Sequence, residues 1–397
     1  MEQTVCNPPD SPLLTRRDAT PPATAGCTRL SESAPTKDAI ARTCRDLILA
    51  VVIIAASVTP ARAQWTLDTK DGKASLRFGF LAQPQLEVID TPDNTATTKN
   101  IFLRRVRILF GGKVSDKWTF FFETDSPNLG KATAGVKDSG SVLMQDAFVT
   151  YNCCDAFKVD AGLILTPLGH NHLQSAATLL AVDYGPYTFL ESTPTGERVG
   201  RDYGAEVRGY PAGHFEYRLG VFQGVRGLDG SNQFRVAGRA VYYPFAADTG
   251  FFYGGTWQGT KRIVALGASF DKQKEYSTYG ADAFVEQPFD KGAAGVTVQF
   301  DWMRFDGGTF LTSLPRQNAY LLEAAVHLAQ SHFSPLVQYA TRNFTNPLTA
   351  DTNSLQAGAA FWMAGHTRNV KFTAGRLHTD GKPNQTQVLL QLQIFFY

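Results

Sequence analysis

The sequence lacks any apolar stretch long enough to form a membrane-spanning helix. Its longest stretch, residues 47–58, falls well short of the roughly 20 residues that a helix needs to cross hydrocarbon. Arg42 and Arg45 precede it and Ala61-Arg62-Ala63 follows it, which is the pattern of a cleaved secretory signal. We therefore expect residues 1–63 to be a disordered extension plus a signal peptide with its apolar core at 47–58, cleaved after Ala63. Residues 64–397 would form one exported domain.

Cysteine, excess charge and catalytic motifs are also scarce. Three of the 5 cysteines precede the predicted cleavage point, and the other two, Cys153 and Cys154, are adjacent, so a disulfide framework is excluded and we expect the pair in a tight turn. A net charge of +2 gives no reason to expect nucleic-acid binding. No Gly-x-Ser-x-Gly elbow is present, and strand histidines such as His327 have no local serine partner, so we expect no enzyme activity. We also expect no cofactor and no metal.

The rest of the chain is a succession of segments in which apolar and polar residues alternate. In the last one, Leu390, Leu392 and Ile394 share one face and Gln391 and Gln393 the other, which suits lipid on one side and water on the other. Sixteen such segments are expected, at 74–88, 100–113, 117–125, 143–152, 156–166, 200–210, 214–223, 233–244, 261–271, 277–286, 294–304, 317–328, 334–342, 353–363, 369–378 and 386–397.

The connections between these segments alternate between short and long. An up-and-down transmembrane barrel has short turns at one end and long loops at the other, so this alternation favours an all-β, 16-stranded antiparallel barrel. The exception is the Phe-rich and Gly-rich link at about 245–260, on the short side, which we interpret as a longer periplasmic turn or a misread strand.

Aromatic residues at strand ends favour a membrane barrel over a soluble sandwich. Girdles of aromatic side chains anchor transmembrane barrels at the lipid headgroups, whereas a sandwich has no need of them. The residues expected in these girdles are Trp118, Tyr151, Tyr210, Tyr242, Tyr243, Trp302, Tyr339 and Trp362.

Two motifs resemble a known family. Residues 102–112, Phe-Leu-Arg-Arg-Val-Arg-Ile-Leu-Phe-Gly-Gly, with 118–125 after them, resemble the early double-arginine strand and hairpin of the phosphate-selective porin O and P family. Residues 200–204, Gly-Arg-Asp-Tyr-Gly, are similar to that family's Gly-Arg-Asp-x-Gly motif. The resemblance implies a trimeric outer-membrane channel of a Gram-negative bacterium. Sixteen-stranded porins fold their third external loop inward, and the longest connection here, 167–199, is in that position.

Arginines are the expected anion ligands of such a pore, because a guanidinium is permanently charged and binds two phosphate oxygens at once. In the second strand, parity places Phe102 and Val106 toward lipid, Arg105 and Arg107 toward the lumen, and Arg104 outward, where we expect it to meet lipopolysaccharide phosphates or a neighbouring loop. Two interpretations remain open for Arg105 and Arg107: they bind permeating anions, or they pair with Glu123 and Asp125 of the neighbouring strand. The other pore-lining candidates are Arg201, Arg208, Arg218, Arg235 and Arg239.

Acidic residues qualify this picture. Asp282, Glu286, Asp301 and Glu323 share the inward parity of later strands, which predicts an acidic wall opposite a basic one. The candidates in the third loop are His170, His172, Asp183, Glu191 and Arg198. We expect passive diffusion of small hydrophilic solutes, small inorganic anions such as phosphate among them. Two alternatives remain: a weakly selective general porin, or a structural or adhesive barrel with a plugged lumen.

Overall fold

The computed structural model describes residues 65–289 and 292–397, so the predicted signal peptide lies outside the described residues. Among these residues no helix is long and apolar enough to span a membrane. The strands are β1 (Trp65–Asp68), β2 (Ser75–Asp90), β3 (Thr97–Lys113), β4 (Trp118–Asp125), β5 (Ala132–Thr133), β6 (Val136–Lys137), β7 (Leu143–Cys154), β8 (Phe157–Leu165), β9 (Arg201–Gly209), β10 (Phe215–Phe222), β11 (Arg235–Tyr242), β12 (Ile263–Gln273), β13 (Tyr276–Phe289), β14 (Ala294–Asp306), β15 (Gln317–Leu328), β16 (Phe333–Phe344), β17 (Thr352–His366), β18 (Arg368–Thr379) and β19 (Gln385–Phe396). The helical turns are α2 (His170–Leu173), α3 (Ser192–Thr195), η1 (Pro211–Gly213) and η3 (Ala329–Ser331).

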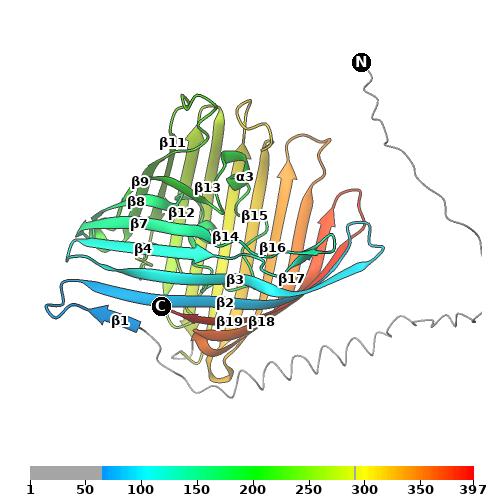
Figure 1. Ribbon diagram of the computed structural model, residues 1–397. Helices are drawn as coiled ribbons and strands as arrows, with labels where there is room; N and C mark the ends of the chain where they lie inside the picture. Colours follow the sequence, from blue (N-terminus) through cyan, green and yellow to red (C-terminus); the bar gives the residue numbers. More distant parts are fainter. Residues whose placement is uncertain (1–64, 290–291) are drawn as a thin grey trace, which may run out of the picture. The chain divides into compact units, whose positions relative to one another are not determined.

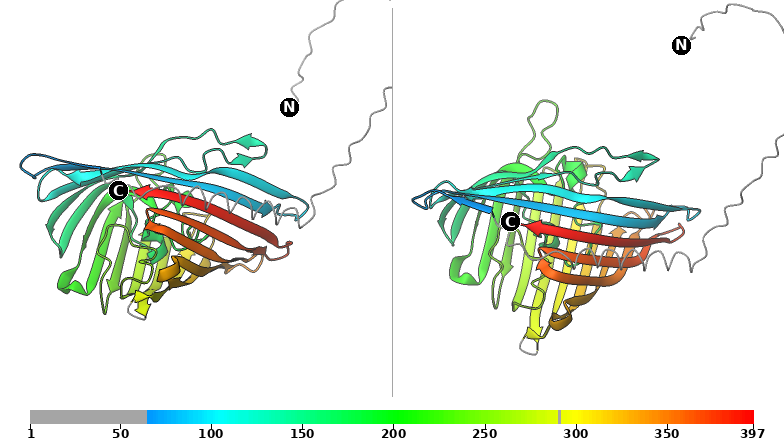
Figure 2. Two further views of the ribbon diagram at one scale, coloured as in Figure 1. Left: turned by 90° about the horizontal axis from the view of Figure 1, so that it is seen from below. Right: turned by 60° about the horizontal axis from the view of Figure 1, so that its bottom comes forward.

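Sixteen of the described strands close into one antiparallel barrel, formed by β2, β3, β4 and β7 to β19 (Figure 1). Each strand pairs with the next along the chain, and β19 pairs with β2 from Gln387↔Ile89 to Phe396↔Phe80. Figure 2 shows β19, in red, beside β2, in blue, at this seam. The short strand β1 pairs with the start of β2. This pairing confirms the predicted sixteen-stranded barrel. Closure leaves no unpaired strand edge, which the hydrocarbon of a membrane would not tolerate.

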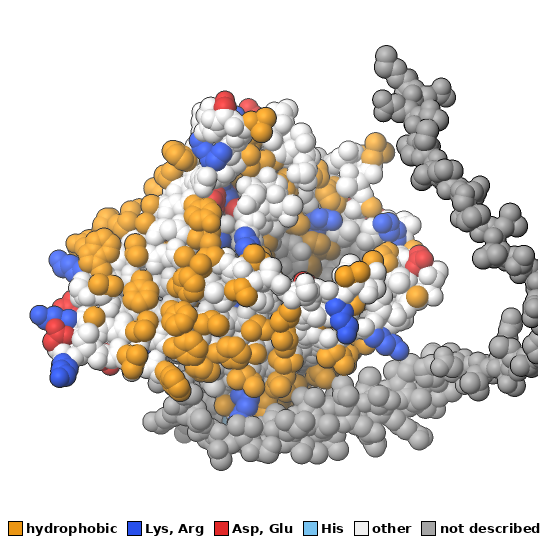
Figure 3. Space-filling model, viewed as in Figure 1, with side chains coloured by type: hydrophobic (Ala, Val, Ile, Leu, Met, Phe, Trp, Pro, Cys, Tyr) orange, Lys and Arg blue, Asp and Glu red, His pale blue; other side chains and the backbone are white. Residues whose placement is uncertain are grey.

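Apolar side chains cover the outer face of the barrel in Figure 3, and charged side chains gather toward its two ends. Trp118 and Tyr151 form an exterior aromatic pair with ring centroids 5.1 Å apart, as expected of a girdle. Three predicted girdle residues are instead buried inside the barrel: Tyr210, Tyr243 and Trp362. For these three the girdle prediction was wrong, because aromatic side chains also pack against segments that fill the lumen.

The loops have the predicted polarity, with one large exception. Long connections, among them 126–142, 166–200 and 307–316, lie at one end, and short turns such as 114–117 lie at the other. Cys153 and Cys154 end β7 as exposed free thiols, and the turn itself is formed by the next two residues. The exception is the connection 243–262, which joins β11 to β12 at the short-turn end. It is therefore a long turn, as one of the two sequence interpretations proposed.

Candidate functional site: the barrel lumen

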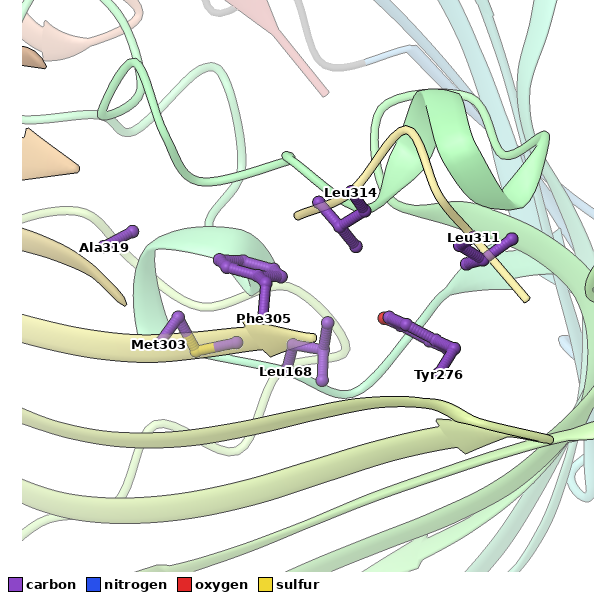
Figure 4. Packing of buried hydrophobic residues seen from close by; sticks show 7 residues of the cluster. All are labelled: Leu168, Tyr276, Met303, Phe305, Leu311, Leu314 and Ala319. Atoms are coloured by element: carbon purple, nitrogen blue, oxygen red, sulfur yellow. The ribbon is translucent and has the colours of Figure 1, made fainter. Parts of the chain in front are cut away.

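The third loop, residues 166–200, lies inside the barrel and contacts strands on several sides. Its start is anchored by Leu168, which packs among apolar residues of β13, β14, β15 and the 307–316 loop (Figure 4). Beyond this anchor, inward polar side chains of the wall bind the loop backbone. These bonds are Asp301 Oδ1 accepting from Asn171 N at 3.0 Å, Gln83 Nε2 to Ala176 O at 3.2 Å, Gln393 Nε2 to Ala177 O at 2.8 Å, Lys371 Nζ to Ala181 O at 3.1 Å and Gln338 Nε2 to Asp183 O at 3.1 Å.

The end of this loop is fixed by the Gly-Arg-Asp motif. Gly200 has φ of +76°, and a Cβ added there would lie 2.5 Å from the His172 ring, so both backbone and space require glycine. His172 Nε2 is 3.0 Å from Oε1 of Glu191, and both side chains are buried. Arg198 and Arg201 exchange backbone hydrogen bonds of 3.3 and 3.1 Å where the loop joins β9. His172, Glu191 and Arg198 therefore have structural partners within the loop or at its junction with β9.

Arg104 and Arg105 share the carboxylate of Asp183 in this loop. Arg104 Nε donates to Oδ2 at 2.6 Å, and Arg105 Nη2 donates to Oδ1 at 2.6 Å. Burial alone would raise the pKa of Asp183, but the two guanidiniums outweigh it and hold that pKa well below its ordinary value. The predicted outward position of Arg104 was wrong.

The physical reason is a β-bulge between β2 and β3. The register shifts between Ala82 and Pro84, so that Gln83 faces two residues of β3, Arg104 and Arg105, instead of one. A bulge inserts one extra residue and reverses the alternation beyond it. Phe102, predicted to face lipid, is accordingly buried at 4% exposure.

A cavity of about 430 Å³ lies between this part of the wall and the third loop. Arg104, Arg105 and Lys131 line one part of it, and Lys131 Nζ pairs with Oε1 of Glu87 at 2.7 Å. Among the described residues Arg104 forms a hydrogen bond through its Nε alone, so both of its terminal NH2 groups remain available to bind a solute. Uncharged amides and hydroxyls of β16 to β19 line another part, namely Gln338, Ser354, Gln356, Thr373 and Gln387.

The other arginines predicted to line the pore wall are buried, and each is paired with a carboxylate. The pairs are Arg107 with Glu123 and Asp125, Arg201 with Asp146, Arg208 with Asp160, Arg218 with Glu216, Arg235 with Asp271 and Glu197, and Arg239 with Asp282. Arg107 therefore has the two carboxylate partners that the ion-pair interpretation named. These arginines are buried inside the barrel, as the alternation of the sequence predicted.

The pairing interleaves carboxylates with the arginines of the predicted basic wall, and one residue of the predicted acidic wall, Asp282, pairs with an arginine of the basic wall. Arg239 of β11 reaches Asp282 of β13 across β12, with Nη2 to Oδ1 at 2.7 Å. It crosses above Gly267, where a Cβ would lie 2.5 Å from both of these atoms. A glycine in the middle strand thus joins charges that parity alone assigned to separate walls.

Two features of the lumen were not identified from the sequence. Lys371 of β18 is buried at 1% exposure and binds carbonyls of the third loop; its signal was a lysine between Val370 and Phe372. The connection 243–262 was recognised as unusual in length and in its Phe and Gly content, but its contacts inside the barrel were not predicted.

Comparison with known proteins gives a family and a fold. The profile of the family "Phosphate-selective porin O and P" matches residues 78–303. No curated protein matches the chain in sequence. An anion-selective porin from Comamonas acidovorans superposes with a TM-score of 0.52 at 12% identity, covering 82% of this chain and 100% of that one. Salmonella typhi OmpF in complex with daunomycin gives 0.57 at 12% identity, with 83% and 100% covered.

Pseudomonas putida OprB is similar to the same degree, with a TM-score of 0.57 at 10% identity over 82% of this chain and 95% of that one. At these identities the likenesses establish the fold alone. The family match spans more than half of the sequence and includes the double-arginine strand and the Gly-Arg-Asp motif. The chain therefore belongs to the phosphate-selective porin O and P family and is an outer-membrane porin.

Proposed function

We propose that this porin passes small hydrophilic solutes by passive diffusion and favours small anions such as phosphate. The observation that carries the proposal is the charge at the loop cavity. Arg104 and Arg105 share one carboxylate, that of Asp183, while Lys131 and Glu87 neutralise each other. One positive charge is therefore left over, and it faces a solute through the available amines of Arg104.

The size of this effect is sufficient to select ions. A unit charge about 7 Å from a permeating anion contributes about 2 kcal/mol at an effective dielectric constant of about 20. Guanidinium groups also bind phosphate oxygens in a bidentate manner, so phosphate should occupy the cavity longer than chloride does. Phosphate would then reduce the current carried by smaller ions.

The test is the reversal potential of the purified porin in a planar bilayer under a KCl gradient, repeated with phosphate added. We expect anion preference and phosphate block, both reduced in Arg104→Ala and Arg105→Ala. Arg316→Ala is the matched control, because Arg316 also pairs with an aspartate but is 52% exposed and does not line the cavity. Anion preference that persists in both cavity variants would contradict the proposal.

A weakly selective porin is the second candidate, supported by the interleaved ion pairs deeper in the lumen. Asp301 and Glu323 place two further carboxyl groups there, bound by amide groups: Asn171 N and Gln299 for the former and Gln338 for the latter. A reversal potential near zero with no phosphate block would favour this candidate.

Export and assembly complete the proposal. Cleavage after Ala63 follows from the signal pattern, and N-terminal sequencing of the mature protein tests it. The family resemblance implies a homotrimer embedded among outer-membrane lipid and lipopolysaccharide, and the mass of the detergent-solubilised protein tests the trimer.

A further inference from the structure

The connection 243–262 pairs with the third loop by main-chain hydrogen bonds. Tyr253 N donates to Leu173 O at 2.9 Å and Ser175 N donates to Tyr253 O at 3.0 Å, which makes a parallel bridge between Tyr253 and Gln174. Gly255 N also donates to Oγ1 of Thr178 at 3.1 Å. A connection that starts at the short-turn end of the barrel thus meets a loop that starts at the other end.

Wall residues on several strands hold the same connection in place. Tyr210, after β9, donates from its hydroxyl to Asp248 O at 2.8 Å. Glu286 of β13 accepts from Trp257 N at 2.9 Å, and His366 of β17 lies 2.9 Å from Thr256 O. Contacts with strands so far apart in the barrel order mean that 243–262 crosses the lumen beside the third loop.

This connection covers arginines that the sequence assigned to the pore wall. Arg218 donates from Nη1 to Phe251 O at 2.9 Å and from Nη2 to Gly250 O at 3.0 Å. Arg239 Nε donates to the Tyr253 hydroxyl at 3.1 Å. The Arg208 guanidinium lies 5.3 Å from the centre of the Phe251 ring. The donors of these arginines are therefore turned to protein rather than to a solute.

The same connection contributes two phenyl rings to an aromatic cluster in the lumen. Phe251 stacks on Phe148 of β7 at 4.3 Å, and Phe252 lies 5.5 Å from Phe121 of β4. Phe121 in turn lies 5.6 Å from the ring of Tyr397. Apolar rings at a narrow point disfavour water and ions, since a hydrated ion must shed its shell without receiving new ligands.

We propose that residues 243–262 form a second constriction that sets the conductance of this porin. The aromatic pair Phe251 and Phe252 narrows the path with apolar surface. The carbonyls of Gly250 and Phe251 bind Arg218, and the Phe251 ring covers Arg208, so both arginines are turned away from solutes. The inference rests on the proposed passive diffusion, because its test measures the current through the pore. Opening this constriction enlarges that current.

The test is the double variant Phe251→Ala/Phe252→Ala, compared with wild type by single-channel conductance. We expect the conductance to rise about twofold or more, because the two rings no longer narrow the path. Phe245→Ala is the matched control, because Phe245 belongs to the same connection but is 40% exposed and packs on Arg262. The control should conduct like wild type.

The ratio of the double variant's conductance to that of wild type decides this inference, and the wild-type reversal potential decides the proposed function separately. A conductance ratio near one in a correctly inserted double variant overturns the second constriction, even if the wild-type porin selects anions. A raised conductance ratio supports the constriction, even if the wild-type porin is unselective. If the double variant does not insert, the single variants Phe251→Ala and Phe252→Ala give the same comparison, each with one ring removed.

Discussion

Acid should loosen the contact between the third loop and the 243–262 connection, because a buried histidine lies between them. The His170 ring stacks on Tyr253 at 5.0 Å and on Phe284 at 4.4 Å, and neither ring nitrogen has a hydrogen-bond partner within the described residues. Burial lowers the pKa of His170 from its ordinary value of 6.5 to about 4. His170 therefore resists protonation while the third loop is docked, that is, packed against the 243–262 connection. It accepts a proton more readily when the loop is undocked from that connection.

The sign follows from linkage. A pKa lowered in the docked state leaves docking unaffected above about pH 6.5 and weakens it progressively as the pH falls toward about 4. Between pH 7 and pH 5 the docking equilibrium should shift about 20-fold toward the undocked loop, or about 2 kcal/mol.

Hydrogen exchange of residues 166–200, corrected for the intrinsic effect of pH, measures this shift. We expect faster exchange at pH 5 in wild type, and a smaller change between the two pH values in His170→Phe. His378→Phe is the control, since His378 is a partly exposed residue near the end of β18 that pairs with Asp380. Equal pH dependence in wild type and His170→Phe would refute the reasoning.

Three other substitutions test contacts inside the barrel. Asp183→Asn removes the carboxylate shared by two guanidiniums. A unit charge about 7 Å from a permeating anion changes the energy of that anion by about 2 kcal/mol, so the reversal potential should move further toward anions. An unchanged reversal potential would contradict this. Gly267→Ala should separate the ion pair of Arg239 and lower the stability by about 3–5 kcal/mol, measured as the urea midpoint of the porin in detergent. Gly111→Ala should displace the phenol of Tyr397 and lose about 0.5–1.5 kcal/mol of aromatic contact, a smaller shift in the same midpoint.

The strands could be predicted from the sequence because lipid enforces alternation over every crossing. Gln391 and Gln393, assigned inward by parity alone, bind Gln85 and the third loop inside the lumen. The length of the third loop and its place in the order were equally visible. These properties depend on neighbours along the chain.

Side-chain direction at Phe102 and Arg104 could not be derived from parity, because the bulge that reverses it is a property of two paired strands. Pro84 was the available signal, since proline inside a strand often marks a bulge. The inward course of 243–262 depends on partners such as Gln174 and Phe121, far away in the sequence. Hydrophobic periodicity carries no information about such contacts.

The seam between β19 and β2 has a consequence for biogenesis. Gln83 and Gln393, which bond to each other across this seam and each bind the third loop, are 310 residues apart. Lys371, which also holds the loop, is on the penultimate strand. The loop is synthesised in the first half of the chain, but two of the residues that hold it, Gln393 and Lys371, are synthesised near the end, and closing so long a loop is slow. The third loop of this porin therefore gains its last wall contacts only when the final strand pairs with the first strand of the barrel.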